Sequence, residues 1–538
     1  MPIRIPERLS GFNPASSPLY CRRMNAVSES APDALLVTAN ARYSHTSLAL
    51  RSLLANLGEL ANRSALAEFT IEEKPSDIVE KILMKNPRTV CLGVYIWNAL
   101  VLAETARILK QIRPDIPIIA GGPEVSFESP AHPVWDHVDY IVSGEGETAL
   151  PRLLAAILDG RPPDTKLIVA DPPDVTRLRL PYDLYSEEDI RHRVVYVEAS
   201  RGCPFTCAFC LSALDKKVRR FPEQPFLDAL ETLYARGARR FKFIDRALHL
   251  AVTPKLLDFF LEKGDPGLFV HFELVPDRLP PTLLDRLKRF PRGAVQVEAG
   301  IQTLDDDVAR RIGRKQDLEK ALQTLETLRK ETGIHIHSDL VVGLPGESLS
   351  TFEQGFNRLF ALGLHEIQVG ILKKLPGAPI AAFDRPFGMV YNRQPPYDIL
   401  KNNLIDFATM QRLKRFAKYF DLVCNRGHFI SFVPLLIGAA PPFERLLALS
   451  DWLYLRTGRT HAIALNRLAE LLFEYVVEVN GVPRSDAANR LFADFKGAGR
   501  RSFPGSVDLY VTDRHPAPPA PSSAAPLPTR QQRHLRSD

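Results

Sequence analysis

Short apolar runs alternate with amphipathic segments over the first third of the chain. Runs of five to eight mainly apolar residues occur at 34–39, 67–71, 89–96, 116–121 and 138–144. Their length and their content of β-branched residues predict buried strands. Between them, apolar residues recur every three or four positions, which predicts helices at 46–58, 76–85, 99–112 and 148–159. This alternation predicts a doubly wound parallel sheet over residues 33–165.

A second alternating block occupies residues 191–394. Its predicted strands are 194–200, 239–245, 268–274, 294–300, 334–343 and 365–372. Its predicted helices are 225–237, 254–263, 281–289, 304–313, 317–332 and 350–362. Six βα units are fewer than the eight that close a TIM barrel, so we expect a partial, TIM-like (β/α)6 barrel in a chain of the α/β class.

The strand pattern fades after Pro395. Helical periodicity continues at 398–420, 442–457, 461–479 and 485–496, which predicts an α-helical third domain over residues 395–512. Three further segments lack a period. Residues 1–32 are expected to be a disordered leader, with Met24 as a second possible start, and the Pro- and Asp-rich residues 166–190 a linker. The Pro-, Ala- and Ser-rich residues 513–538 are expected to form a disordered tail.

The composition is that of an ordinary globular chain. Of 538 residues, 45% are hydrophobic and 25% are charged, and the net charge of +6 is not concentrated in a basic run, so nucleic-acid binding is not expected. We expect no membrane span and no secretion signal, because long apolar runs are missing. Three of the six cysteines lie within residues 203–210, unlike the spread pairs of a disulfide framework. This pattern predicts a cytoplasmic protein with one thiolate-bound metal site.

The cysteine cluster directly follows the first strand of the second block, in the segment EASRGCPFTCAFCLS (198–212). Cys203, Cys207 and Cys210 form a CxxxCxxC motif at the predicted barrel mouth. Thiolates are the usual ligands of iron–sulfur clusters, and three of them can hold a [4Fe–4S] cube while one iron stays open. The alternative is a zinc knuckle, but the second CxxC pair that zinc sites usually carry is missing.

This motif, with an aromatic residue before its last cysteine, resembles that of the radical S-adenosylmethionine (SAM) superfamily. The resemblance implies that the open iron binds the amine and carboxylate of SAM. It also implies that one electron from the cluster cleaves SAM to methionine and a 5′-deoxyadenosyl radical. The SAM contacts implied by the resemblance are Phe209, Asp245, Glu273, Glu298, Gln302 and Ser338. For the strand-end residues, the alternative is a solvated or ion-paired barrel rim.

Three turns of the first block lie at successive strand ends: VYIWN (94–98), AGGPEVSF (120–127) and VSGEGE (142–147). Open α/β sheets bind ligands at this edge, and the GEGE turn offers N–H groups to an anionic or nucleotide-like tail. Placed before the cysteine motif, these turns resemble the flavodoxin-like cobalamin (B12)-binding domain of class B radical SAM proteins. The cobalamin contacts implied by the resemblance are Asn40, Arg42, His45, Tyr95, Trp97, Asn98, Gly121, Gly122, Pro123, Gly144, Glu145, Gly146 and Glu147.

The histidine that follows the first predicted strand departs from the family pattern. Cobalamin domains that ligate cobalt through histidine carry DxHxxG, whereas this chain has His45 without the Asp and the Gly. Such a histidine lacks its usual orienting carboxylate. The alternative is a residue at a helix N-terminus capped by Ser44 or Thr46.

The third domain resembles a C-terminal extension of unknown function found in a subgroup of these proteins. Within it, Asn425 and Arg426 either face the barrel mouth or cap the preceding helix.

Together these resemblances imply a radical SAM enzyme that uses a [4Fe–4S] cluster, SAM and cobalamin to methylate an unactivated carbon or a phosphinate. They imply a small-molecule or peptide substrate and an electron donor such as flavodoxin or ferredoxin. The alternatives are a radical SAM enzyme that catalyses rearrangement or cyclisation without methyl transfer, and a non-enzymatic cobalamin or cluster sensor. A methylthiotransferase acting on transfer RNA is disfavoured because a second cysteine triad is missing.

Overall fold

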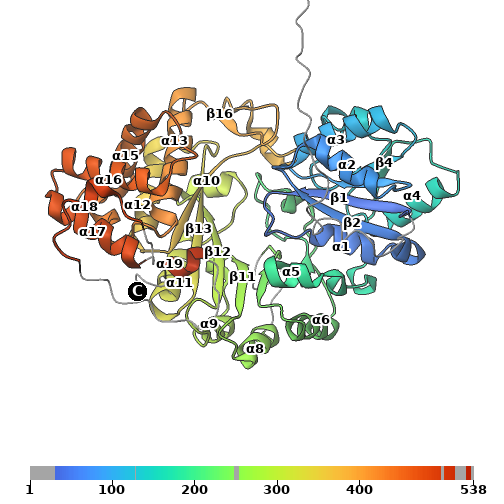
Figure 1. Cartoon of the computed structure of the whole chain (residues 1–538), viewed down its shortest axis with the longest axis horizontal. Coiled ribbons are helices and arrows are strands. Elements are labelled where there is room, and N and C mark those ends of the chain that lie inside the picture. The colour runs from blue at the N-terminus through green and yellow to red at the C-terminus, as the bar shows by residue number, and fades with distance from the viewer. Residues whose placement is uncertain (1–30, 128, 247–253, 498–501, 515–528, 535–538) are drawn as a thin grey trace, which may run out of the picture.

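The computed structural model describes residues 31–127, 129–246, 254–497, 502–514 and 529–534. The predicted leader lies outside these residues apart from its last two positions. The N-terminal domain and the helical domain lie on opposite sides of a central barrel (Figure 1). Among the described residues, no helix combines the length and the apolar character needed to cross a bilayer.

The N-terminal domain is the predicted doubly wound sheet. Its strands are all parallel and lie in the order β2-β1-β3-β4-β5-β6. In chain order they are β1 (Ala34–Asn40), β2 (Ser64–Thr70), β3 (Val90–Gly93), β4 (Ile118–Gly121), β5 (Tyr140–Ser143) and β6 (Leu167–Val169). The sheet therefore extends past the predicted boundary at residue 165. The sequence pattern missed β6 because this short edge strand buries little: Val169 is 75% exposed.

Helices cover both faces of this sheet (Figure 1). One face packs against α2 (Pro75–Met84) and α3 (Ala99–Ile112), and the other against α1 (Leu48–Ala55) and α4 (Ala149–Leu158). Alternate residues of β1 serve the two cores, since Leu35 and Val37 face one and Leu36 faces the other. The carboxyl ends of the strands are left free to form the predicted turns.

The central domain is the predicted open barrel. Its six parallel strands lie in the order β14-β13-β12-β11-β10-β7. They are β7 (Val195–Val197), β10 (Arg240–Phe243), β11 (Phe269–Leu274), β12 (Val295–Gln302), β13 (His335–Val342) and β14 (Glu366–Ile371). The outer helices are α6 (Glu223–Ala235), α8 (Pro254–Lys263), α9 (Pro281–Leu287), α10 (Asp306–Arg311), α11 (Leu318–Glu331) and α12 (Leu349–Ala361).

The segment predicted as a linker is packed against the barrel. Before the short helix α5 (Glu187–His192), Tyr182 and Tyr185 are buried beside the edge strand β7. The Tyr185 hydroxyl donates to the Tyr196 carbonyl at 2.7 Å and accepts from the Tyr196 N–H at 3.1 Å, and Tyr182 does the same at Glu198. These hydroxyls satisfy backbone groups that an edge strand otherwise exposes. Composition alone suggested a loose connection because Pro and Asp obscured the two tyrosines.

The third domain is mainly helical and begins with a hairpin. Residues 398–406, predicted as helix, contain the strand β16 (Ile399–Lys401), which pairs with β15 (Val390–Tyr391). The helices are α13 (Phe407–Phe420), α14 (Val433–Ile437), α15 (Pro442–Thr457), α16 (Leu465–Glu478), α17 (Arg484–Gly497), α18 (Gly505–Asp508) and α19 (Thr529–His534). A π-helical turn at Asp421–Asn425 follows α13.

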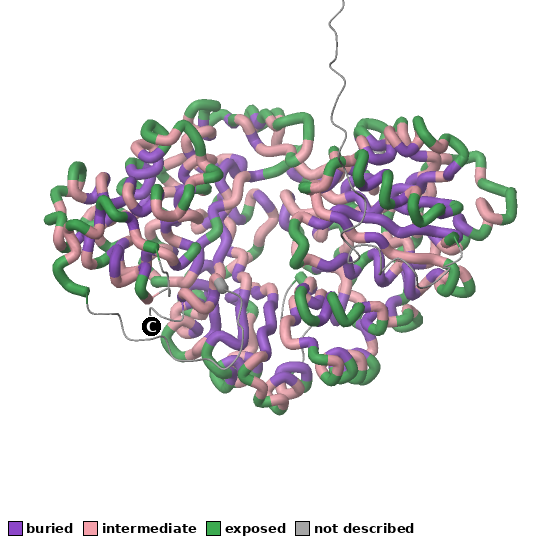
Figure 2. Tube along the Cα trace, viewed as in Figure 1, coloured by how far each residue is buried: buried purple, intermediate pink, exposed green. Residues whose placement is uncertain are grey.

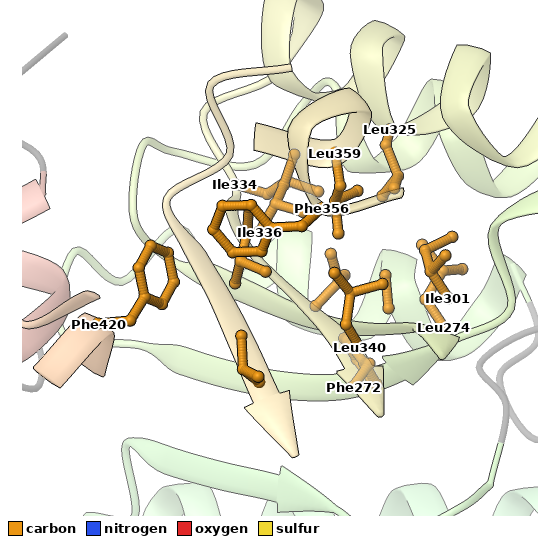
Figure 3. Packing of buried hydrophobic residues seen from close by; sticks show 14 of the residues in the cluster. Phe272, Leu274, Ile301, Leu325, Ile334, Ile336, Leu340, Phe356, Leu359 and Phe420 are labelled. Atoms are coloured by element: carbon orange, nitrogen blue, oxygen red, sulfur yellow. The ribbon is translucent and has the colours of Figure 1, made fainter. Parts of the chain in front are cut away.

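One apolar core joins the barrel to the helical domain. The cluster runs from the barrel strands through α12 to α13, where the rings of Phe356 and Phe420 meet at 5.2 Å (Figure 3). Figure 2 shows the strands of both sheets buried and the outer helix faces exposed. Each fully buried side chain of this size contributes about 1.5–3 kcal/mol, so the helical domain is an integral layer of the barrel.

Helix α19 corrects the expectation that all of residues 513–538 are disordered. Gln531 and His534 are buried, and Arg530 pairs with Glu366 at the start of β14, with 2.6 Å between Nη2 and Oε2. The Gln531 side chain also contacts Gln296 in β12 at 2.5 Å. These contacts close the end of the barrel opposite the cysteines. Composition could not indicate them, because α19 is stabilised by contacts with residues far away in sequence.

Candidate active site

The three motif cysteines lie in a loop that leaves the barrel after β8 (Ser200–Arg201). Cys203 and Cys207 are buried, and Cys210 is partly buried. Gly202 has a φ of +89° and lies so close to the Lys217 carbonyl oxygen that a Cβ would come within 2.2 Å of it. The loop can therefore begin its turn only at a glycine.

The far side of the cysteine loop is bound to the segment after α10. The Thr206 hydroxyl donates to the Gly313 carbonyl at 2.9 Å, and the Ala208 N–H donates to the Ile312 carbonyl at 2.8 Å. Arg314 places Nη1 3.5 Å from Cys207 Sγ. A cation near the thiols favours the thiolate form that binds iron.

The burial of the cysteines is also consistent with a cluster. Burial raises the pKa of the Cys203 thiol, a preference that coordination to a metal reverses. Over the described ranges, no three His, Cys, Asp or Glu side chains are arranged around a single metal ion. Cysteines that bind separate irons of a cube do not need to converge on one point. The arrangement of the cysteines is therefore compatible with a cluster.

Carboxylates gather in the barrel lumen next to the loop. Glu273 on β11, Glu298 on β12 and Asp339 on β13 belong to neighbouring strands. Burial raises the pKa of Glu273 to about 7 even though Arg246 lies 3.8 Å away. Burial also raises the pKa of Asp339, and the charges of Glu298 and Glu273 raise it further.

Glu298 behaves in the opposite way to the other two carboxylates. His271 Nε2 lies 3.3 Å from Glu298 Oε2. Burial alone would raise the pKa of Glu298, but His271 and His337 outweigh it and lower the value to about 2. The surroundings therefore shift the pKa values of the lumen carboxylates in opposite directions, which is a common property of functional sites.

Two of the predicted SAM contacts have structural roles. Ser338 is fully buried, faces away from the lumen and donates to the Ala299 carbonyl at 2.9 Å. Its neighbour Asp339 faces the lumen instead, because successive residues of a strand alternate between the two faces. Asp245 accepts from the Ala199 and Ser200 N–H groups at 3.0 and 2.6 Å and thereby holds the chain that enters the cysteine loop. Phe209 packs against the barrel core.

Gln302 ends β12 in an unusual backbone conformation. Its φ is +71°, and the Thr303 N–H donates to the Ile301 carbonyl at 2.9 Å across it, which makes a strained γ-turn. Glu347, in the GLPGE turn after β13, accepts from the Thr303 hydroxyl at 2.5 Å. Burial raises the pKa of Glu347 to about 8. This buried pair holds the turn that carries Gln302, and neither Arg314 nor Glu347 was among the predicted site residues.

A cavity of about 450 Å³ separates the N-terminal domain from the cysteine loop. The predicted cobalamin residues that line it are Tyr95, Gly121, Gly122, Pro123, Gly144, Glu145, Gly146 and Glu147. Its other wall includes Ser200, Gly202, Leu211 and Arg246, which surround the cysteine loop. The N-terminal wall is shaped for close approach, because Gly122 has a φ of +110° and a Cβ there would lie 2.4 Å from the Val94 carbonyl oxygen.

The other predicted cobalamin residues are not part of the cavity wall. Asn98 is fully buried, and its amide donates to the Ala39 carbonyl at 3.0 Å, so it supports the turn from behind. Asn40 donates to Glu68 at 3.0 Å. Arg42 is exposed, and Trp97 stacks on Tyr95 with ring centroids 4.6 Å apart.

His45 lies at the contact between the domains. Its ring meets the edge of the Tyr196 ring on β7 at 6.2 Å, and burial together with the charge of Lys242 lowers its pKa. The helix that follows is capped by Ser47, whose hydroxyl accepts from the Leu50 N–H, and not by Ser44 or Thr46. The position of His45 favours a role in domain docking over one at the cavity.

The GEGE turn is occupied by ion pairs within the protein. Arg201 contacts Glu145, Glu147 and Glu198 at 2.7–2.8 Å, and its side chain is only 13% exposed. Arg219 pairs with Glu145 as well. This network joins the two domains beside the cavity. These ion pairs involve the side chains of the turn, so the binding of an anionic tail by its backbone N–H groups stays a prediction.

Asn425 is also structural. It is buried, and its side chain accepts from the Ile367 N–H and donates to the Ile367 carbonyl, at 3.0 and 2.8 Å. It therefore extends the edge strand β14 instead of facing the mouth or capping a helix.

Three family models match the chain in sequence order. They are the B12 binding domain at residues 34–154, the radical SAM superfamily at 197–359 and the protein of unknown function DUF4080 at 385–502. Residues 197–359 therefore form a radical SAM domain, preceded by a B12-binding domain. The helical DUF4080 domain follows these two. The predicted family and fold class are thereby confirmed.

Curated relatives match over about half of their own length. A 2-(S-pantetheinyl)-carbapenam-3-carboxylate methyltransferase from Streptantibioticus cattleyicolor is 28% identical over 55% of this chain and 48% of that protein. The cobalamin-dependent radical SAM methyltransferase TokK from Streptomyces tokunonensis is 28% identical over 58% and 49%. An anaerobic magnesium-protoporphyrin IX monomethyl ester cyclase from Rubrivivax gelatinosus is 28% identical over 54% and 57%.

Solved structures share the fold at lower identity. The cobalamin-dependent radical enzyme OxsB with aqua-cobalamin and SAM bound covers 87% of this chain and 83% of its own, with a TM-score of 0.58 and 12% identity. The methyltransferase TsrM from Kitasatospora setae covers 64% and 74%, with a TM-score of 0.53 and 19% identity.

Proposed function

We propose that this protein is a cobalamin-dependent radical SAM methyltransferase that acts on a small molecule or peptide. The observation that carries the proposal is the shared cavity. One wall consists of the glycine turns at the carboxyl edge of the B12-binding sheet, and the other surrounds the cysteine loop. A substrate in this space would lie between both cofactors, which is the arrangement that a methyl relay requires. The methyltransferases among the relatives support the same reaction.

The cysteine loop and the lumen fit a cluster with bound SAM. Cys203, Cys207 and Cys210 would hold three irons of a [4Fe–4S] cluster. Arg314, beside Cys207, would bind the carboxylate of SAM, since guanidinium groups pair with carboxylates. Glu273, Asp339 and Gln302 would bind its amine and ribose hydroxyls. When bound, the cluster and SAM would supply the radical and the corrinoid would serve as the methyl carrier, while the protein orients these cofactors and excludes water.

The corrinoid would lie against Gly121, Gly122 and Gly146, which line the cavity and whose missing side chains let the turns of this wall pack closely on their own domain. At Gly146, a Cβ would already lie 3.0 Å from Leu53. Tyr95, next to these turns, would face the ring. His45 would not ligate cobalt, because its ring docks on Tyr196 at the domain contact.

A cyclase is the second candidate, because one relative is named as a cyclase. The two reactions differ in the fate of the methyl group of SAM. The cluster-loaded protein, reconstituted with cobalamin, is incubated with SAM carrying a labelled methyl group and a reductant. Methyl transfer predicts both 5′-deoxyadenosine and S-adenosylhomocysteine, with label retained by the corrinoid or substrate. Cyclisation or rearrangement predicts 5′-deoxyadenosine alone. If neither product is released, the protein is a sensor.

The proposal includes an external one-electron donor, flavodoxin or ferredoxin, and a cytoplasmic location, where the cysteines stay reduced. Replacing a chemical reductant by reduced flavodoxin should sustain the release of 5′-deoxyadenosine. A protein that responds only to the chemical reductant would require a different donor.

A further inference from the structure

A segment of the DUF4080 domain crosses to the B12-binding domain. After β14, the chain forms the β15–β16 hairpin, which lies next to the N-terminal domain in Figure 1. Within it, the Lys374 N–H donates to the Tyr397 carbonyl at 3.1 Å, so the two sides of the segment are joined. The family description assigns no role to this domain.

One contact from this segment and one from the loop that precedes it reach the AGGPEVSF turn (120–127) of the B12-binding domain. The Tyr397 hydroxyl donates to Glu124 Oε1, across 273 positions of sequence. Glu124 is only 3% exposed, and the nearest imidazole nitrogen, His132 Nε2, is 3.7 Å away. Gly377, at a φ of +80°, lies against Phe127 so closely that a Cβ would come within 2.4 Å of the ring.

The turn that receives these contacts forms part of the cavity wall. Gly121, Gly122, Ser126 and Phe127 line the cavity on both sides of Glu124. The turn also supports the next one, because the Ser126 hydroxyl accepts from the Gly144 N–H at 3.1 Å. A shift at Glu124 would therefore be transmitted to both glycine turns.

Burial and the hydrogen bond from Tyr397 act on the Glu124 carboxyl in opposite directions. Burial raises the pKa of Glu124, and the hydrogen bond from Tyr397 opposes that rise. A buried acceptor that loses its donor bears a desolvation cost of about 1–3 kcal/mol, which a movement of the turn toward solvent would relieve. The hydrogen bond from Tyr397 therefore stabilises the observed conformation of the turn.

We propose that Tyr397 is a positioning residue: through Glu124 it holds residues 121–127 in the shape that accepts the corrin ring, so that the DUF4080 domain helps to build the corrinoid site. This inference rests on the proposed dependence on cobalamin. It gives the third domain a function in the reaction that does not require contact with the substrate.

The test compares Tyr397→Phe with Tyr391→Phe in the full chain. Tyr391 lies in the same hairpin, and its hydroxyl donates to Met389 Sδ at 3.5 Å, so it is a matched control. Hydroxocobalamin is titrated into cluster-loaded protein and followed by absorbance. We expect the Kd of Tyr397→Phe to rise roughly tenfold, as loss of a hydrogen bond to a carboxylate predicts, and that of Tyr391→Phe to stay unchanged. Equal Kd values for Tyr397→Phe and the wild type, or equal losses in both variants, would overturn the inference.

A second measurement does not depend on the corrinoid. Hydrogen exchange of the peptide that covers residues 121–127 should be faster in Tyr397→Phe than in the wild type, without any cofactor. Glu124→Gln keeps an acceptor oxygen and should preserve slow exchange, whereas Glu124→Ala should not. If the wild type binds no corrinoid, the proposed function fails, and the exchange experiment still decides whether Tyr397 holds the turn. Unchanged exchange in both Tyr397→Phe and Glu124→Ala would refute the positioning role.

Discussion

Replacing Arg201 by methionine should destabilise the protein in a pH-dependent way. The side chain, 13% exposed, is paired with Glu145, Glu147 and Glu198, whose side chains are 28%, 6% and 11% exposed. Arg201→Met keeps much of the volume but leaves the buried carboxylates of Glu147 and Glu198 without this cation, while Glu145 keeps Arg219. Breaking a buried ion pair from one side costs about 3–5 kcal/mol at neutral pH. That is a large part of the total stability of most domains.

The pH dependence has a definite sign. Burial raises the pKa of Glu198, and Arg201 is the main influence that lowers it. Without Arg201, the folded Glu198 carboxylate binds a proton at pH values where the unfolded chain does not, so the variant gains stability as the pH falls. The deficit should therefore be largest near pH 8 and should shrink as the pH approaches the ordinary pKa of glutamate.

Urea unfolding of both proteins at pH 8 and pH 5, followed by circular dichroism, measures this deficit. The control is Arg177→Met, since Arg177 is 86% exposed and pairs with Asp174 at the surface, where little change is expected. A deficit of the same size at both pH values would refute the electrostatic reasoning and indicate lost packing of the arginine stem.

Three further results are expected. Anaerobically purified protein should carry about four irons per chain, and iron retained after all three motif cysteines are changed to alanine would contradict the cluster. Glu347→Ala should relax the strained turn at Gln302 and weaken SAM binding roughly fivefold in calorimetry, as loss of one buried hydrogen bond implies. Glu347→Gln keeps an acceptor and should bind SAM more tightly than Glu347→Ala does. Equal SAM affinities of Glu347→Ala and the wild type would exclude this role. Tyr185→Phe should cost about 1–3 kcal/mol in urea unfolding, because it unpairs the N–H and the carbonyl of Tyr196, and an unchanged midpoint would show that water replaces the hydroxyl.

Much of the fold could be predicted because its information is local. The apolar runs gave both parallel sheets and the partial barrel, since burial on both faces leaves a direct trace in the sequence. The errors lie where little is buried or where composition misleads. β6 is short and exposed, β16 lies inside a helical period, and Tyr182 and Tyr185 stand among prolines and aspartates.

The residues of the candidate site also divide into those that the sequence identified and those that it missed. Cys203, Cys207 and Cys210 were identifiable because their spacing is itself the chemical signal, and the glycine turns because a missing side chain is visible in the sequence. Asp339 could have been chosen over Ser338 from the alternation along β13, where His335 and His337 share its face. No local pattern indicated Arg314 or Glu347, which reach the site from a segment after α10 and a turn after β13.

By itself, the sequence determined the order of the domains, most of the parallel strands of the two sheets and the position of the cysteine loop. These follow from residue periodicity and spacing over a few turns of chain. Only the tertiary structure decided that Arg201 joins two domains, that α19 closes the barrel and that Tyr397 reaches Glu124. Each is a contact between residues far apart in sequence, and its energy depends on burial that exists only once the domains have packed together.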